Sequence, residues 1–151
     1  MSNPLRTIED YELFLYSLKE QFKSIRRSTV IVSRRGAFLA RVSGELQFDH
    51  GIRFIIRERI LYHRLPAVID EYGYEVWDAK EKLFWYDAQP HPDDLTLQKT
   101  YPHHKHIRPN IKNNRVPAPG NSFNNPNLPG IIREIENFIE KIGKEDESKR
   151  E

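Results

Sequence analysis

The residues most able to do chemistry lie in the segment Tyr101-Pro102-His103-His104-Lys105-His106, which holds three of the six histidines of the chain. In an extended chain, His104 and His106 point to one side, whereas the residue before each of them points to the other. Imidazole titrates near neutral pH, so two histidines on one side can act as a general base and a general acid. The ammonium group of Lys105 can stabilise the charge that develops on a phosphate or an oxyanion.

These groups match what a metal-independent ribonuclease needs: a base for the 2′-hydroxyl, an acid for the leaving oxygen and a cation for the phosphate. We predict that His104 and His106 transfer the protons and that no cofactor takes part. Charge on the phosphate would be stabilised by Lys105 and Arg57. The predicted catalytic residues, with two that orient the others, are His104, His106, Lys105, His103, Asp87 and His91.

Asp87 follows directly on the apolar run 83–86, so it lies at the end of an expected strand. Functional side chains are often presented at such a position. Aspartate ahead of Ala88-Gln89-Pro90 can equally form an Asx turn, in which its side chain binds the backbone two residues on. Both interpretations of Asp87 stay open at this point.

The same histidines could instead hold a metal ion. His104 and His106 form an H-x-H pair, and His91 or Asp87 would be the third ligand of a zinc, nickel or non-haem iron site. A third interpretation is structural, because clustered histidines in a loop can cap backbone groups and stack on aromatic rings. For the whole chain, a non-catalytic RNA- or protein-binding module stays open beside the ribonuclease and the metal-dependent enzyme.

Charge is unevenly distributed around this segment. Residues 95–133 contain no Asp or Glu, although the whole chain carries a net charge of only +2. An acid-free basic segment favours phosphate or an acidic partner, because nothing nearby neutralises it. The alternative is a loop whose charges simply face water.

Arginines mark one face of the strand expected after the turn Asp49-His50-Gly51. Arg53, Arg57 and Arg59 alternate there with apolar residues, and a register that places them beside Arg41 would form a stripe able to hold an RNA backbone. The alternative is an ordinary solvated sheet face that pairs with Glu45. Glu58 shares the apolar face and is expected at the edge of the sheet, with a buried carboxylate that has a function as the alternative. The predicted substrate-binding residues are Arg57, Arg53, Arg41, Tyr101 and Arg108.

Length and composition limit the class of protein. The 151 residues, at 17.9 kDa, suit one domain, and the absence of cysteine excludes disulfides, thiolate metal sites and cysteine nucleophiles. No apolar run approaches the roughly 20 residues needed to span a bilayer. Glycine-rich phosphate loops, G-x-S-x-G and H-E-x-x-H are absent. We expect a soluble, cytoplasmic protein with no membrane contact; its oligomeric state stays open.

Hydrophobic periodicity predicts an α+β fold, with an antiparallel meander of about five strands between two helices. Helical spacing covers 7–25 and 131–142, with Gly143 as the stop. Eight of the ten prolines lie between residues 90 and 129, so we expect a long functional loop over 90–128. The domain would span 1–143, followed by a disordered charged tail over 144–151. The helices would cover one face of the sheet and leave the other for a ligand. The expected strands lie at 28–33, 38–48, 52–56, 72–76 and 83–86.

Two motifs resemble those of the TumE-type toxins of prokaryotic toxin–antitoxin pairs. They are Tyr86-Asp87-Ala88-Gln89-Pro90-His91-Pro92 and the histidine segment at 101–106, within a resemblance that covers about residues 28–142. Ala88 stands where the family has Asn, and Pro92 where it has a second His. The resemblance implies a toxin that a cognate helix-turn-helix antitoxin neutralises, with RNA cleavage of a RelE-like kind.

Overall fold

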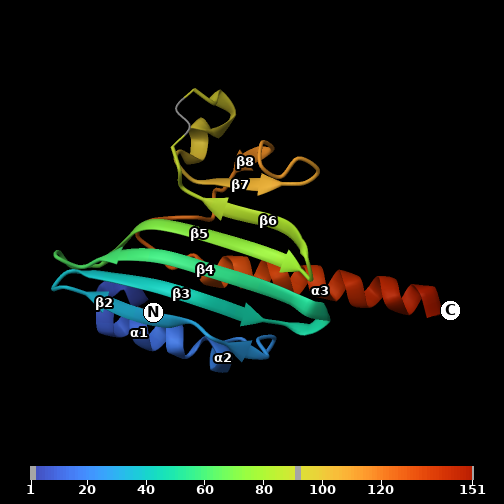
Figure 1. Ribbon diagram of the computed structural model, residues 1–151, viewed down its shortest axis with the longest axis horizontal. Helices are drawn as coiled ribbons and strands as arrows, with labels where there is room; N and C mark the ends of the chain where they lie inside the picture. The colour runs from blue at the N-terminus through green and yellow to red at the C-terminus, as the bar shows by residue number, and fades with distance from the viewer. Residues whose placement is uncertain (1–2, 91–92, 151) are drawn as a thin grey trace.

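The structure is a computed structural model that describes residues 3–150 except 91 and 92 (Figure 1). Its helices are α1 (Ile8–Tyr16), α2 (Leu18–Gln21) and α3 (Leu128–Arg150), with short 3-10 helices at Pro4–Arg6, Asp49–Gly51 and Leu95–Thr100. Its strands are β1 (Arg27–Ser28), β2 (Ile31–Arg35), β3 (Leu39–Gln47), β4 (Ile52–Leu61), β5 (Val68–Asp78), β6 (Glu81–Asp87), β7 (His104–Ile107) and β8 (Arg115–Pro117). The predicted α+β class is confirmed.

All strand pairs of the sheet are antiparallel, in the order β1-β3-β4-β5-β6-β7-β8, and β2 pairs with the same strand β3 as β1 does. The predicted meander is therefore confirmed, but it is longer than expected. The prediction of loop throughout 90–128 is wrong, because β7 and β8 form there. The four residues of β7 contain no proline and alternate buried with half-buried side chains, as a strand requires.

Both long helices pack on one face of the sheet (Figure 1). Alternate residues of β4, such as Phe54 and Ile56, are fully buried and share one core cluster with Tyr11 of α1 and Ile132 of α3. The opposite side of the sheet, which we call the open face, carries the other set of β4 residues, including Arg57. The expectation that helices cover a single face is confirmed.

Glu58 is buried on the helix-covered face, so its predicted place at the sheet edge is wrong. Its carboxylate accepts hydrogen bonds from the hydroxyls of Tyr11, at 2.6 Å, and Tyr74. The side-chain amide of Asn127 donates in turn to Tyr74, at 3.1 Å. Two hydroxyl donors from sequence-distant elements, one of them held by Asn127, make it possible to bury this carboxyl group, and no feature of the local sequence indicates them.

Two helix boundaries differ from the prediction. The first helix is interrupted at Ser17, whose hydroxyl binds the carbonyl of Leu13 and competes with the helical hydrogen bonds. The last helix continues through Gly143 to Arg150, where a stop and a disordered tail were predicted. Gly143 does not adopt the left-handed conformation that ends helices, and an ion pair between Glu140 and Lys144 spans it.

The Glu58→Gln variant should gain stability relative to wild type, and this gain should be larger at pH 8 than at pH 4. Burial raises the pKa of Glu58 above 4.5, although the two tyrosine hydrogen bonds lower it in part. The folded chain thus holds the proton more tightly than the unfolded chain, so wild-type stability falls as pH rises through the folded pKa. Each unit by which the folded-state pKa exceeds the unfolded-state pKa lowers the free energy of unfolding by about 1.4 kcal/mol at pH values above both.

Urea unfolding at the two pH values measures this difference. Glu71→Gln, on the exposed side of the adjacent strand, is the matched control and should show no such pH-dependent gain. An equal effect of Glu58→Gln at both pH values would contradict the buried carboxyl as the cause.

Candidate functional site

Asp87, His104 and His106 converge on the open face, at the end of β6. Antiparallel register sets Asp87 opposite His104 and Trp85 opposite His106. Asp87 Oδ1 lies 2.6 Å from His104 Nε2, Asp87 Oδ2 lies 3.5 Å from His106 Nε2, and the two Nε2 atoms are 3.1 Å apart. We call these three residues the Asp-His-His cluster. The prediction that His104 and His106 point to one side is confirmed.

Backbone carbonyls fix the orientation of both imidazoles. Nδ1 of His104 lies 3.0 Å from the carbonyl oxygen of Pro102, and Nδ1 of His106 lies 3.0 Å from that of Ile111. A carbonyl only accepts hydrogen bonds, so each Nδ1 carries a proton. In a neutral ring, Nε2 then carries a lone pair that can accept a hydrogen bond or bind a cation. A protonated ring instead donates its Nε2–H, as in the 2.6 Å contact of His104 Nε2 with Asp87 Oδ1.

The contacts within the cluster shift the pKa values of Asp87 and His104. Burial raises the pKa of Asp87, but hydrogen bonds from His104, His106 and Trp85 outweigh it and hold that pKa well below its usual range. Burial lowers the pKa of His104, but the hydrogen bonds to Asp87 and to the Pro102 carbonyl outweigh it and raise the pKa above 6.5. The cluster therefore favours an ionised carboxylate beside a positive charge.

Access to the cluster is from the carboxylate side. His104 is 0% exposed and His106 is 4% exposed, whereas the side chain of Asp87 is 24% exposed. Trp85 covers His106, with ring centroids 3.8 Å apart, and donates a hydrogen bond to Asp87 Oδ2 at 3.0 Å. Small groups that enter from solvent thus meet Asp87 first.

Asp87 also forms the Asx turn that was the alternative interpretation. The backbone N–H of Gln89 donates to Asp87 Oδ1, at 3.1 Å. The turn and the contacts with the histidines coexist, because the carboxylate has two oxygens with several lone pairs.

Two predicted catalytic residues lie on the helix-covered side of the sheet. Lys105 Nζ binds Glu134 of α3, at 2.6 Å. His103 lies beside Tyr72, with Nδ1 2.6 Å from the tyrosine hydroxyl, and the two rings stack. Burial lowers the pKa of His103, and the charge of His104 lowers it further. The structure does not bring either residue to the cluster.

The predicted arginine stripe exists on the open face. Arg41 faces Arg59 across β3 and β4, Arg57 faces Gly73 on β5, and Arg53 pairs with Glu45 at 3.3 Å. The register thus places Arg59 beside Arg41, which was the condition for the stripe.

Arg57 shares a row of the sheet with the cluster. Register pairs Arg57 with Gly73, Gly73 with Asp87, and Asp87 with His104 on successive strands. A Cβ at Gly73 would lie 3.0 Å from an Arg57 guanidinium nitrogen, so this glycine leaves room for the arginine to lie across β5. The Arg57 side chain is 69% exposed, and its ion pair with Glu75 is long, at 3.9 Å.

The remaining predicted site residues are Tyr101, Arg108 and His91. Tyr101 is 49% exposed beside the start of β7, and Arg108 forms an ion pair with Glu81. His91 lies outside the described residues.

Sequence reasoning missed Trp85 and Arg115 as parts of the site. Trp85 precedes Asp87 by two positions, so strand alternation alone could have placed both on one face. Arg115 faces His106 from β8, and its Nε is buried without a hydrogen-bond partner among the described residues. No sequence signal indicated Arg115, because β8 lies in the segment expected to be loop.

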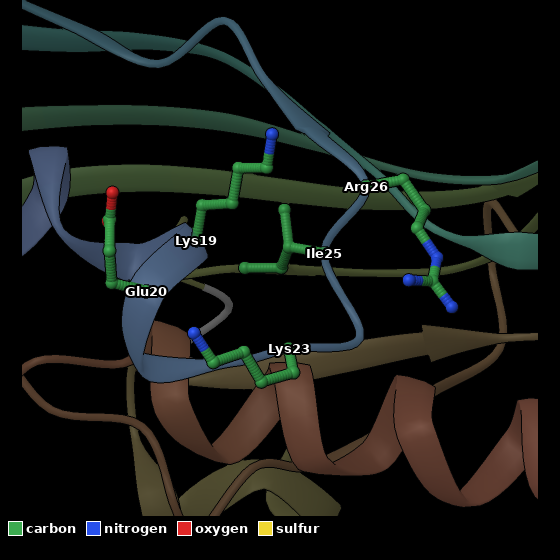
Figure 2. Close-up of a pocket in the computed structure, with 5 residues that line it drawn as sticks. All are labelled: Lys19, Glu20, Lys23, Ile25 and Arg26. Carbon is green, nitrogen blue, oxygen red and sulfur yellow. The ribbon is translucent and has the colours of Figure 1, made fainter.

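A shallow pocket lies at the opposite edge of the molecule, between α2 and β1. Figure 2 shows that the charged ends of Lys19, Lys23 and Arg26 point in different directions there. Arg26 is already paired with Asp49, at 2.9 Å. The pocket has no converging groups comparable to the Asp-His-His cluster.

A metal could be held by the same cluster. Within residues 3–90 and 93–150, it is the one group of three potential ligands, with donor atoms all within 4.8 Å of one another. Two imidazole nitrogens and a carboxylate oxygen are ligands typical of zinc and other first-row transition metals.

Comparison with protein families places most of the chain in a known family. The family model described as Toxin TumE matches residues 14–144, which is most of the chain. The chain belongs to the TumE toxin family. Membership in a toxin family implies a cognate antitoxin. No curated protein and no solved structure matches this TumE-family chain significantly. Among its described residues, no helix has the length and apolar character to cross a membrane.

Asp87→Asn should lower the pKa of His104 in this TumE-family toxin. The carboxylate raises that pKa against burial, so without its charge the burial that favours the neutral ring acts with less opposition. An NMR titration of the ring protons of the chelator-treated protein measures the change. Glu71→Gln, an acid-to-amide change elsewhere on the open face, should leave the His104 pKa unchanged; an equal response to both variants would contradict the contact.

Proposed function

We propose that this TumE-family chain is the toxin of a type II toxin–antitoxin pair and that it cleaves RNA at the Asp-His-His cluster. The observation that carries the proposal is the convergence of the two Nε2 atoms, 3.1 Å apart, on an ionised carboxylate at the end of an arginine-bearing sheet face. A helix-turn-helix antitoxin in the cytoplasm is the proposed partner.

RNA cleavage needs three operations at the scissile phosphate. A base takes the proton of the 2′-hydroxyl, and the 2′-oxygen forms a bond to phosphorus. The bond from phosphorus to the 5′-oxygen then breaks, and an acid protonates that oxygen. The products are a 2′,3′-cyclic phosphate and a 5′-hydroxyl end. Positive charge near the phosphate stabilises the intermediate state.

Two routes supply the proton transfers at this cluster. In the first, which the sequence predicts, the rings of His104 and His106 accept and donate the protons directly. In the second, Asp87, His104 and His106 would hold a metal ion, and that ion would supply a base by lowering the pKa of water. Burial of both rings favours the second route, because a direct acid or base must come within about 3 Å of the substrate atom.

Arg57 supports binding of the RNA backbone beside the cluster. It lies in the same row of the sheet as Asp87, two strands away, so the two backbones are roughly 10 Å apart. Arg115, which faces His106, provides a second positive charge on the other side of the cluster. Lys105 has no such role in this proposal, because Glu134 holds it on the helix-covered side.

The double variant His104→Ala/His106→Ala should lose RNA cleavage and growth arrest together. Labelled RNA is incubated with purified protein, with and without ribosomes and with and without chelator, and expression in a bacterial host reports toxicity. Far-UV circular dichroism verifies that the variant is folded. Growth arrest by the wild type with no cleavage of any RNA pool would contradict RNA as the target.

Arg57→Ala should weaken RNA binding and lower its salt dependence. An arginine that contacts one phosphate contributes about one to the slope of log affinity against log salt concentration. Arg133→Ala, an exposed arginine on α3, is the matched control and should change neither quantity. Equal losses for the two variants would indicate a general charge effect and contradict a contact at Arg57.

A further inference from the structure

We infer that the Asp-His-His cluster is a binding site for one divalent first-row transition-metal ion of the zinc class. The ligands are a carboxylate oxygen of Asp87 and the Nε2 atoms of His104 and His106. The inference deepens the proposed function, since it concerns the same site, but metal binding can be measured without RNA.

Separations within the cluster suit a shared ion. Two ligand atoms that each lie 2.0–2.2 Å from a tetrahedral zinc ion are about 3.3 Å apart. The Nε2 atoms of His104 and His106 are 3.1 Å apart, and Asp87 Oδ2 lies 3.5 Å from His106 Nε2. The shorter contact, 2.6 Å between Asp87 Oδ1 and His104 Nε2, is a hydrogen bond that the ion would replace.

Backbone carbonyls bind the imidazoles of His104 and His106 in the way that is typical of histidine ligands in metal sites. Histidine ligands almost always donate their second ring N–H to a carbonyl or a carboxylate, which fixes the ring and leaves the other nitrogen for the metal. Here Nδ1 of His104 binds the Pro102 carbonyl and Nδ1 of His106 binds that of Ile111. With both Nδ1 atoms anchored, deprotonation at Nε2 leaves two ligand nitrogens 3.1 Å apart beside the carboxylate, where one metal cation can bind all three groups.

The donor set selects the class of metal. Magnesium and calcium prefer oxygen ligands, whereas imidazole suits zinc, nickel, cobalt and iron. Three protein ligands leave at least one coordination position for water or a phosphate oxygen, as in catalytic zinc sites. The partly exposed carboxylate of Asp87 marks the direction from which that position is open.

The test uses full-length protein without a histidine tag, purified without metal-affinity chromatography and stripped with chelator. Calorimetric titration with zinc should give one ion per chain, and cobalt should give an absorption spectrum of bound ion. His104→Ala and His106→Ala should each weaken zinc binding by about 100-fold or more, since loss of a ligand exceeds the roughly 10- to 100-fold effect of an outer-sphere change. Magnesium at the same concentration should not bind.

Asp87→Asn keeps the size of the side chain, so it tests the third ligand if an alanine variant fails to fold. It should weaken zinc binding and change the cobalt spectrum. His63→Ala removes an exposed histidine distant in sequence and is the matched control, with unchanged stoichiometry and affinity. No zinc bound by the wild type, or equal binding by wild type and all three cluster variants, would overturn the inference.

The two proposals fail in different ways. One zinc per chain that depends on the cluster, with no RNA cleaved by the zinc-loaded protein, supports the metal site and contradicts the proposed ribonuclease. RNA cleavage by a chain that binds no metal in the titration supports the ribonuclease and overturns the metal site.

Discussion

The antiparallel pairing of β7 with β6 is the constraint on which the candidate site depends. It sets His104 opposite Asp87 and His106 opposite Trp85, all on the open face. A slip of one residue would exchange the two faces of β7 and place Lys105 among the acidic and aromatic groups there. Contacts on the helix-covered side oppose such a slip, because Lys105 binds Glu134 and His103 binds Tyr72.

The helix-covered side provides a fixed support for that strand pair. Glu134 of α3 accepts hydrogen bonds from Lys105 on β7 and from Tyr86 on β6, so one carboxylate joins the helix to both strands. Further into the core, Asn127 joins the start of α3 to Tyr74, which binds Glu58. Polar networks of this kind are costly to bury unless every member is satisfied, so they favour one arrangement of the elements.

Local patterns in the sequence predicted which side chains of a strand share a face, because this depends only on the alternation of residues along the strand. Strand alternation places His104 and His106 on one face, and Arg53 and Arg57 likewise, without knowledge of distant contacts. The structure confirms both predictions. The neighbourhood of Asp87 and the histidines could not be derived in the same way, because it depends on strand pairing across a proline-rich segment. Arg115 was missed for the same reason.

Charge on the open face also limits how the site can work. Acids already pair with Arg53 and Arg59, and Glu75 binds Lys82 at 2.7 Å. In the described part of the chain, Arg41 and Arg57 are the arginines of the stripe that lack a close ion pair. Under the proposed function, these two arginines offer few phosphate contacts and a modest electrostatic affinity for RNA. Selectivity and rate would then depend on the recessed cluster itself, where a small group must enter past Asp87 to reach two imidazoles that already face each other.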